Sequence, residues 1–378
     1  MARRSARSVA LVGTYPPTAC GLATFTSNLR LAIVAGRSDW QAGVVRVVDG
    51  WEPPPSVEVV GQWVAGDVAS LSRSVEVLNS FDAVLLQHEY GLFGGCDGED
   101  VVGLVDGLEV PLVAVLHTAL MEPSLHQRNV LESVIEASAT VVVQSEAARQ
   151  RILAVHDKDP DAVVVVPHGA AANFVGPVLA DVARPAVLTW GLLGPGKGIE
   201  HAITAVARLP RSAAASYIVA GQTHPKVRAT CGESYRESLQ EQARSLGVGD
   251  RVRFDSAYRD WDSLRALVRS VDVVLLPYDS PDQVSSGVLV EAVASGKPVV
   301  ATRFPHAVEV LADGAGIVVG HGDVDAMAVA LESVLCEAGL AGRMAAAARR
   351  AAAAMLWPAV GASYRALIDR VITDRVVA

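Results

Sequence analysis

Several features that would assign a protein to a class at once are missing from this sequence. It contains only four cysteines, which lie far apart with no CxxC pair and no histidine at ligand spacing: Cys20, Cys96, Cys231 and Cys336. This spacing predicts neither a disulfide framework nor a zinc site, and it favours reduced thiols in a cytoplasmic protein. No apolar run approaches the roughly 18–20 residues of a membrane-spanning helix. A peripheral position at the inner face of a membrane is the alternative location.

Positive charge is also scarce. The 378 residues include 32 lysines and arginines against 41 aspartates and glutamates, which gives a formal net charge of −9. A protein that follows a nucleic-acid duplex needs a basic excess to neutralise phosphates, so nucleic acid is excluded as the expected partner. A local phosphate pocket is still compatible with this balance, because one or two well-placed cations suffice for a nucleotide.

Hydrophobic residues make up 51% of the chain, which excludes general disorder. Short Val-rich runs that are apolar on both faces alternate with longer stretches of helical spacing. Such runs are typical of strands buried in a parallel sheet. The strands predicted in this way are 8–12, 44–48, 83–87, 112–116, 140–143, 163–166, 186–190, 217–220, 271–276, 298–302 and 316–319.

The order of these elements predicts the fold class. Strand and helix alternate along both halves of the chain, which indicates a doubly wound α/β architecture. The alternation breaks near residues 176–185, where two proline-containing pairs bracket a short polar stretch. We therefore predict two Rossmann-like domains facing a cleft, the first covering residues 1–178 and the second 179–357.

A glycine-rich segment follows the strand that ends at Trp190 and precedes a helix: Gly191-Leu192-Leu193-Gly194-Pro195-Gly196-Lys197-Gly198. It fits the phosphate-binding P-loop pattern until Gly198 replaces the Mg²⁺-binding hydroxyl, and its GxGxG spacing departs from the dinucleotide fingerprint. Backbone amides at a helix N-terminus together with the Lys197 ammonium would still suit a diphosphate. A plain turn with an exposed surface lysine is the alternative interpretation.

A second candidate segment runs from Gln283 to Glu291. Ser285, Ser286 and Gly287 are small residues at the start of a predicted helix, where N-capping chemistry also suits an anion. Glu291 follows one turn later among residues of buried types. A buried glutamate normally needs a partner, and ribose hydroxyls are good partners for a carboxylate. A solvated position on the helix surface is the alternative.

These and other segments resemble the family-4 retaining glycosyltransferases of the GT-B fold over nearly the whole chain. The matching segments are Tyr15–Gly21 at the first strand-to-helix turn, Leu116–Thr118 at a strand end, Val166–Gly169 before the interdomain linker, Gly194–Gly198, Gln283–Glu291 and Ala292–Pro298. The resemblance implies that the N-terminal domain binds the acceptor and the C-terminal domain binds a nucleotide sugar. It also implies that the last helix, about residues 358–378, packs back on the N-terminal domain.

The resemblance further implies metal-independent transfer of a hexose, with retention of configuration, from a nucleotide-diphospho-sugar to a hydroxyl of a sugar or glycolipid acceptor. Mannose and glucose are the expected hexoses, from GDP-mannose as the first choice or from UDP-glucose; no cofactor, metal or oligomeric state is implied. The implied catalytic residues are His117, Lys197 and Glu291. The implied donor-binding residues are Gly21, Gly194, Gly196, Lys197, Gln283, Ser285, Ser286, Gly287 and Glu291.

Two residues depart from the family pattern. Leu192 stands where the family commonly has arginine, and Gln283 replaces the first glutamate of a paired motif. These departures keep two alternatives open. One is another GT-B enzyme, such as a sugar-nucleotide epimerase or a phosphorylase, and the other is an inactive module that only binds a sugar nucleotide.

Two further polar segments follow predicted strands. His88, Glu89 and Tyr90 come directly after a buried strand, at the edge where open sheets bind ligands, and we expect them to contact the acceptor. The alternative is a capped turn with a structural histidine. Asp323 and Asp325 form the DxD pattern of metal-dependent transferases, but they open a predicted helix and are interpreted as N-capping residues.

Overall fold

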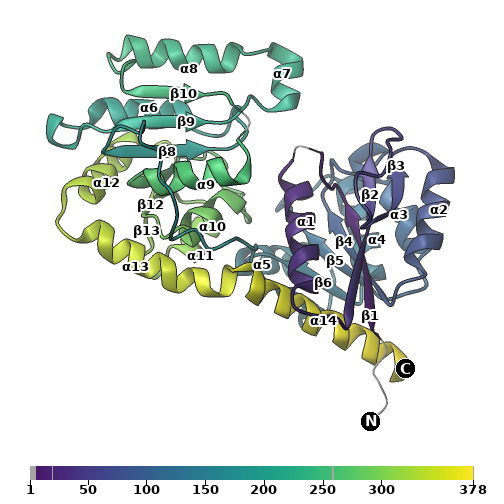
Figure 1. Ribbon diagram of the computed structural model, residues 1–378. Helices are drawn as coiled ribbons and strands as arrows, with labels where there is room; N and C mark the ends of the chain where they lie inside the picture. The colour runs from purple at the N-terminus through teal and green to yellow at the C-terminus, as the bar shows by residue number, and fades with distance from the viewer. Residues whose placement is uncertain (1–5, 19, 258, 378) are drawn as a thin grey trace. The chain divides into compact units, whose positions relative to one another are not determined.

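The computed structural model describes residues 6–18, 20–257 and 259–377, and the side chains among them up to residue 375. The chain forms two compact units, one made of residues 1–169 and 357–378 and the other of residues 170–356. Each unit is a parallel sheet covered by helices (Figure 1). The predicted doubly wound α/β class is confirmed.

The division between the units falls after Gly169, ahead of the boundary expected after residue 178. The segment that follows Gly169 forms its hydrogen bonds within the second unit. Asn173 N donates to Ala294 O at 3.0 Å, and Arg269 Nε donates to Pro177 O at 2.8 Å. These bonds explain why the segment belongs to the second unit rather than to the first.

The first unit contains a seven-stranded parallel sheet in the order β3-β2-β1-β4-β5-β6-β7. Its strands are β1 (Arg7–Gly13), β2 (Trp40–Val48), β3 (Val59–Val64), β4 (Ala83–His88), β5 (Leu112–Leu116), β6 (Thr140–Val143) and β7 (Val163–Val165). Every residue of β4, β5 and β6 is buried, as expected for strands that helices cover on both faces. The edge strand β3 is absent from the sequence-based prediction.

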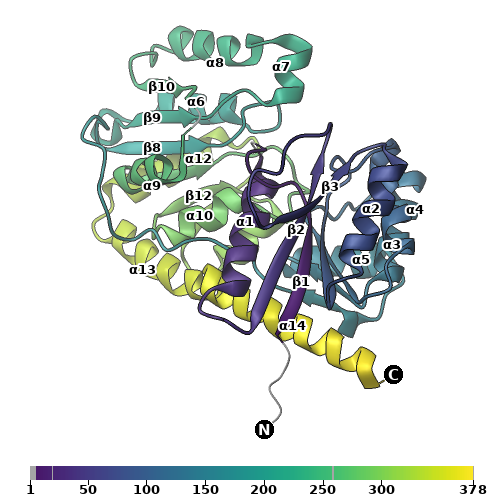
Figure 2. The ribbon, with the colours of Figure 1, turned by 45° about the vertical axis from the view of Figure 1, so that its right-hand side comes forward.

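Helices cover both faces of this sheet (Figures 1 and 2). One face is covered by α1 (Gly21–Val34) and α14 (Trp357–Val377). There Phe25, Leu29 and Tyr364 pack against alternate residues of β1, β4 and β5. The opposite face is covered by α2 (Val68–Leu78), α3 (Asp100–Asp106), α4 (Leu125–Ala137) and α5 (Glu146–Val155).

The C-terminal helix α14 lies alongside α1. Gly361 allows the close approach, since a Cβ at this position would lie 2.5 Å from Ala32 O. Arg365 Nη1 donates to Ala32 O at 2.7 Å and to Ile33 O at 3.1 Å. These carbonyls belong to the last turn of α1 and have no partner within that helix. The end of the chain is therefore fixed to the first unit by packing and by a C-terminal cap.

The second unit contains a six-stranded parallel sheet in the order β10-β9-β8-β11-β12-β13. Its strands are β8 (Ala186–Trp190), β9 (Ser216–Ala220), β10 (Val252–Asp255), β11 (Val273–Leu276), β12 (Val299–Thr302) and β13 (Gly316–Val319). Neighbouring side chains enter opposite cores: Val187 packs with one helical layer and Leu188 with the other.

The two helical layers of the second unit follow from this alternation. One layer contains α6 (Ile199–Arg208), α8 (Ser234–Ser245) and α12 (Val324–Cys336). The other contains α9 (Trp261–Ser270), α10 (Gly287–Ala294), α11 (Pro305–Val310) and α13 (Leu340–Ala352). A short helix, α7 (Pro225–Cys231), precedes α8.

In each sheet the strand order reverses once. The reversal lies between β1 and β4 in the first unit and between β8 and β11 in the second. Doubly wound folds bind ligands beside the carboxyl ends of the strands at such a point. The loops that follow these four strands are therefore the places to look for a functional site.

Candidate functional site

The glycine-rich segment predicted to bind phosphate forms the loop between β8 and α6. Backbone hydrogen bonds attach it to both neighbouring loops. Leu193 N donates to Gln222 O at 2.8 Å, and Asp279 N donates to Gly196 O at 3.0 Å. Gln222 follows β9 and Asp279 follows β11, so the loop is fixed from two sides of the sheet.

Two glycines of this loop have different surroundings. Gly198 is the N-cap of α6 with a φ of +61°, and a Cβ there would lie 1.8 Å from Pro277 O. Both its conformation and its contacts therefore exclude a side chain. Gly196 also has a positive φ, +85°, but nothing lies within 4 Å of its Cβ position. The backbone at Gly196 is thus open to a ligand.

Lys197 lies over an aromatic ring instead of extending into solvent. Its Nζ is 4.5 Å from the centroid of the Tyr278 ring, a cation–π distance. Burial lowers the pKa of Lys197, and no carboxylate among the described residues counteracts this shift. A half-buried ammonium without a counter-ion favours an anionic ligand.

Tyr278 connects Lys197 with the start of α10. Burial raises the pKa of Tyr278 to about 12, against the effect of a hydrogen bond with the Ser286 side chain. Ser286 is the N-cap of α10, and its hydroxyl accepts from Leu289 N at 3.3 Å. Its own N donates to His306 Nδ1 at 2.9 Å. The helix start predicted at Ser285, Ser286 and Gly287 is confirmed.

Gln283 precedes this helix and stabilises the turn before it. Its Nε2 donates to Ser285 O at 3.0 Å, so the amide hydrogen-bonds the backbone of the loop. A glutamate at this position could not donate that hydrogen bond. The replacement of glutamate by Gln283 therefore has a structural explanation within this loop.

Glu291 lies one turn into α10, among buried residues of the same helix. Burial raises the pKa of its carboxyl to about 7, and the nearby Arg265 guanidinium has the opposite, smaller effect. Arg265 belongs to α9, and its buried Nε has no hydrogen-bond partner among the described residues. The motif analysis does not identify Arg265, because its approach to Glu291 depends on the packing of α9 beside α10.

In the first unit, His117 begins the loop after β5. Its Nε2–H donates to Gln87 Oε1 at 2.8 Å, and its Nδ1 accepts from Gln144 Nε2 at 3.1 Å; these two amides assign the proton to Nε2. Burial lowers the pKa of His117 to about 3. The imidazole is therefore neutral at neutral pH, and both of its ring nitrogens are engaged by the two amides.

The three polar residues at the end of β4, His88, Glu89 and Tyr90, differ in burial and in hydrogen bonding. His88 is 0% exposed, and neither its ring nitrogens nor the Tyr90 hydroxyl has a hydrogen-bond partner among the described residues. Glu89 is partly exposed and accepts from Thr118 Oγ1 at 2.5 Å and from Tyr90 N at 3.1 Å. The burial of His88 supports the structural-histidine alternative, whereas a contact of Glu89 with the acceptor stays a prediction.

Gly21 is the first residue of α1, after the loop that follows β1. This loop is held by Arg46, a buried residue of β2. The Arg46 guanidinium donates to Tyr15 O at 3.2 Å and to Thr18 Oγ1 at 2.9 Å, and it pairs with Glu52 at 2.7 Å. Sequence analysis missed Arg46, because only strand pairing brings it to this loop.

The DxD pattern is a helix cap. Asp323 is the N-cap of α12 and accepts from Ala326 N at 2.9 Å. Asp325 forms an ion pair with Arg208. The N-capping interpretation is confirmed, and these carboxylates are engaged with the protein.

The fold and the loops at its strand ends define a class of protein. Residues 177–351, which include the Lys197 loop and α10, match the family described as "Glycosyl transferases group 1". This part of the chain therefore resembles the group 1 glycosyltransferases, family GT4, and the chain as a whole has the GT-B fold.

Individual relatives agree with this assignment. The D-inositol 3-phosphate glycosyltransferase of Corynebacterium glutamicum (strain R) is 28% identical over 302 residues, which are 72% of this chain and 70% of that protein. The lipopolysaccharide core biosynthesis glycosyltransferase LpsE of Rhizobium meliloti (strain 1021) is 33% identical over 164 residues, and the chain spans only 42% of it. A solved structure of Anabaena HepE in complex with UDP and glucose has a TM-score of 0.77 at 16% identity and covers 96% of this chain and 100% of that one.

Proposed function

We propose that this protein transfers a hexose from a nucleotide-diphospho-sugar to an acceptor hydroxyl, with retention of configuration and without a metal ion. The donor binds to the second unit and the acceptor to the first. The main support is the contact of one ring, Tyr278, with both Lys197 and the N-cap of α10. This contact brings an uncompensated ammonium close to a helix N-terminus, and the two together suit a diphosphate.

In this proposal the donor has two groups of contacts. Lys197 Nζ and the amides of Gly196 and Gly287 bind the diphosphate, and the Glu291 carboxylate accepts hydrogen bonds from the ribose hydroxyls. Arg265 favours the ionised form of Glu291 against the larger, opposite effect of burial, because an adjacent guanidinium stabilises the charged form of a carboxyl. Leu192 is partly exposed and supplies no charge, so Lys197 is the principal cation of this loop.

The chemistry is mainly electrostatic. As the bond between the sugar and the phosphate breaks, negative charge grows on the diphosphate, and preorganised donors such as Lys197 stabilise it most at that stage. The acceptor attacks the face from which the diphosphate departs, and a phosphate oxygen takes the acceptor proton. In this proposal neutral His117 exchanges one of its two hydrogen bonds, with Gln87 or Gln144, for a hydrogen bond to the sugar.

The proposed donor is UDP-glucose or GDP-mannose. UDP-glucose is now the first to test, because the structurally similar HepE was solved with UDP and glucose. GDP-mannose is the first choice from the sequence. The relatives named for D-inositol 3-phosphate and lipopolysaccharide core suggest a polyol phosphate, sugar or glycolipid as the acceptor.

A thermal-shift screen of nucleotide sugars tests the donor assignment. A ligand at 100 times its dissociation constant adds about 2.7 kcal/mol to the free energy of unfolding. We expect UDP-glucose or GDP-mannose to raise the melting temperature of the wild type and to raise that of Lys197→Ala much less. An equal rise in both proteins would exclude Lys197 as a donor contact.

An inactive binding module remains the second candidate, because Leu192 and Gln283 replace two charged residues of the family pattern. Release of nucleoside diphosphate with and without acceptor separates the candidates. Acceptor-dependent release supports the transferase, whereas tight donor binding without product from any acceptor supports the binding module.

A further inference from the structure

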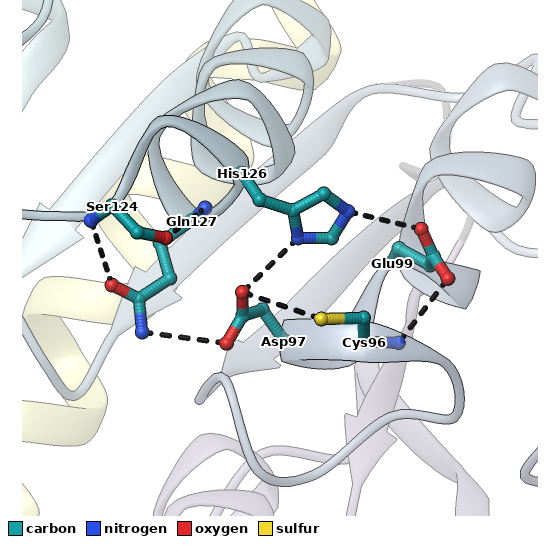
Figure 3. A network of polar contacts seen from close by, with 6 residues as sticks. All are labelled: Cys96, Asp97, Glu99, Ser124, His126 and Gln127. Atoms are coloured by element: carbon teal, nitrogen blue, oxygen red, sulfur yellow. Dashed lines mark hydrogen bonds and ion pairs between the residues drawn. The ribbon is translucent and has the colours of Figure 1, made fainter.

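A cluster of metal-binding side chains lies in the first unit, outside the candidate donor site. Cys96 and Asp97 belong to the turn η1 (Cys96–Gly98), which follows β4, and His126 lies in the first turn of α4. One thiol, one carboxylate oxygen and one imidazole nitrogen lie within 4.8 Å of one another (Figure 3). Sequence spacing did not predict this cluster, because 29 residues separate Asp97 from His126.

The backbone at Asp97 places the first two of these side chains together. Asp97 has a φ of +50° and a ψ of 23°, a left-handed conformation that is uncommon outside glycine. In an extended segment, neighbouring side chains would point to opposite sides. In the left-handed turn the Cys96 thiol instead faces the Asp97 carboxylate, which in turn faces His126 (Figure 3).

The distances between the ligand atoms are close to those around a bound ion. Asp97 Oδ2 is 3.0 Å from His126 Nδ1 and 3.7 Å from Cys96 Sγ. In a tetrahedral zinc site, with Zn–S of about 2.3 Å and Zn–N and Zn–O of about 2.0 Å, adjacent ligands are roughly 3.3–3.5 Å apart. The two distances from Asp97 Oδ2 thus differ from these values by a few tenths of an ångström, and all three ligand atoms lie within 4.8 Å of one another.

Surrounding side chains already orient two of the ligands. His126 Nε2 is 3.1 Å from Glu99 Oε2, so Nδ1 faces the cluster. Asp97 Oδ1 accepts from Gln127 Nε2 at 3.3 Å, and Gln127 forms the capping box with Ser124 at the start of α4. Partners of this kind fix the tautomer and direction of zinc ligands; here they are Gln127 of α4 and Glu99, which lies between η1 and α3.

We propose that Cys96, Asp97 and His126 bind one Zn²⁺ ion, with water as the fourth ligand. A thiolate, an imidazole and a carboxylate together form a ligand set suited to zinc. On binding, Cys96 releases its thiol proton and His126 its Nδ1 proton to solvent, and His126 then coordinates through Nδ1 while its Nε2–H donates to Glu99. The ion is structural and takes no part in the transfer chemistry.

The proposed ion would restrain the loop between β4 and α3. Gly98 packs against the other end of this loop, since a Cβ there would lie 2.9 Å from Tyr90 O. Zinc would thus link α4 to the segment that begins with Glu89, the predicted acceptor contact. Its effect is expected on the order of this loop and on the stability of the first unit.

A zinc titration of the chelator-treated full chain, in competition with a chromophoric chelator, tests the site. The wild type is expected to bind one equivalent of Zn²⁺. Cys96→Ser and His126→Asn are expected to bind it at least about 100-fold more weakly, and Glu99→Gln roughly 10- to 100-fold more weakly. Cys231→Ser, which removes another exposed cysteine, is the matched control and should bind like the wild type.

Two further readouts do not depend on activity. Cobalt(II) should give a thiolate-to-metal charge-transfer band with the wild type and with Cys231→Ser but not with Cys96→Ser. Zinc should raise the melting temperature of the wild type and of Cys231→Ser but not that of Cys96→Ser. The proposal is overturned if the wild type shows no saturable zinc binding, or if Cys96→Ser and His126→Asn bind zinc as tightly as the wild type.

Discussion

Two ionisable side chains of the second unit lie in surroundings that oppose their own charge. Burial lowers the pKa of Lys197 and raises that of Glu291 to about 7; both shifts favour the neutral form. Such groups reduce the stability of a fold, and they are concentrated at functional sites. We interpret both as donor contacts whose charges are compensated when the nucleotide sugar binds.

Glu291→Gln is expected to separate affinity from stability. The folded protein holds the Glu291 proton more tightly than the unfolded chain does, with a pKa of about 7 against 4.5, so this group reduces stability as the pH rises from 4.5 through 7. At pH 8 the variant should therefore melt at a higher temperature than the wild type. It should also bind nucleotide roughly 10- to 100-fold more weakly, a loss of about 1–3 kcal/mol, because one of two acceptor oxygens is lost.

Two controls make the Glu291 result specific. Glu237→Gln, at an exposed position of α8, should change neither the melting temperature nor the nucleotide affinity. A 2′,3′-dideoxy nucleotide should bind the wild type weakly and be almost indifferent to Glu291→Gln. If Glu291→Gln left nucleotide affinity unchanged, Glu291 would have no place in the donor site.

At the residue scale, the sequence predicts side chains that are adjacent to a turn or a helix start. Lys197 and Glu291 are found in this way, since each has a fixed spacing from small residues at a helix N-terminus. Arg265 and Tyr278 are not, because they approach the site from other elements. Contacts of that kind depend on packing and leave no pattern of spacing along the chain.

At the scale of elements, the prediction is accurate where strands are buried on both faces. β8 and α10 have the predicted limits, 186–190 and 287–294. The missed strands β3 and β10 are both edge strands, and most of their residues are exposed or half-buried. Polar residues are tolerated at an edge, so neither strand appears in the sequence as an apolar run.

The loop between β8 and α6 offers a matched pair of glycine substitutions. Gly198→Ala would combine a positive φ with a Cβ 1.8 Å from Pro277 O, whereas Gly196→Ala has a positive φ alone. We expect Gly196→Ala to lower the free energy of unfolding by about 1 kcal/mol and Gly198→Ala by at least 2 kcal/mol more. Chemical denaturation measures both values, and equal losses would contradict the close contact described for Gly198.

At the scale of the whole molecule, the first unit contains three histidines that its fold keeps neutral. Burial lowers the pKa of His88 and His168 to about 4 and that of His117 to about 3. The unfolded chain binds these protons near pH 6.5. Stability is therefore fully present above that pH and is lost as the pH falls toward 4, because only the unfolded chain gains protons in this range.

The acid sensitivity can be measured by melting temperature as a function of pH. Each of the three histidines should lower the free energy of unfolding by up to about 1.4 kcal/mol for each unit that the pH falls between pH 6 and 4, and the melting temperature should fall with it. His88→Gln removes one titrating group that has no hydrogen bond among the described residues. The melting temperature of this variant should therefore fall less steeply with decreasing pH than that of the wild type. Identical slopes would show that His88 is protonated in the folded protein.

No helix in the described part of the chain is long and apolar enough to cross a bilayer.

In the proposed function, the two units have different roles. The second unit supplies the groups for the nucleotide and the diphosphate, and the first supplies Glu89 and His117 for the acceptor and the sugar.

The central claim is that Lys197 stabilises the departing diphosphate during acceptor-dependent hexosyl transfer. Steady-state release of nucleoside diphosphate tests it most directly, with the donor that raises the melting temperature and without added Mg²⁺ or Mn²⁺. The account predicts acceptor-dependent release by the wild type and a kcat at least about 100-fold lower for Lys197→Ala, whose melting temperature should not fall because a half-buried charge without a counter-ion is removed. Equal kcat values for the two proteins, or release only after Mg²⁺ or Mn²⁺ is added, would contradict it.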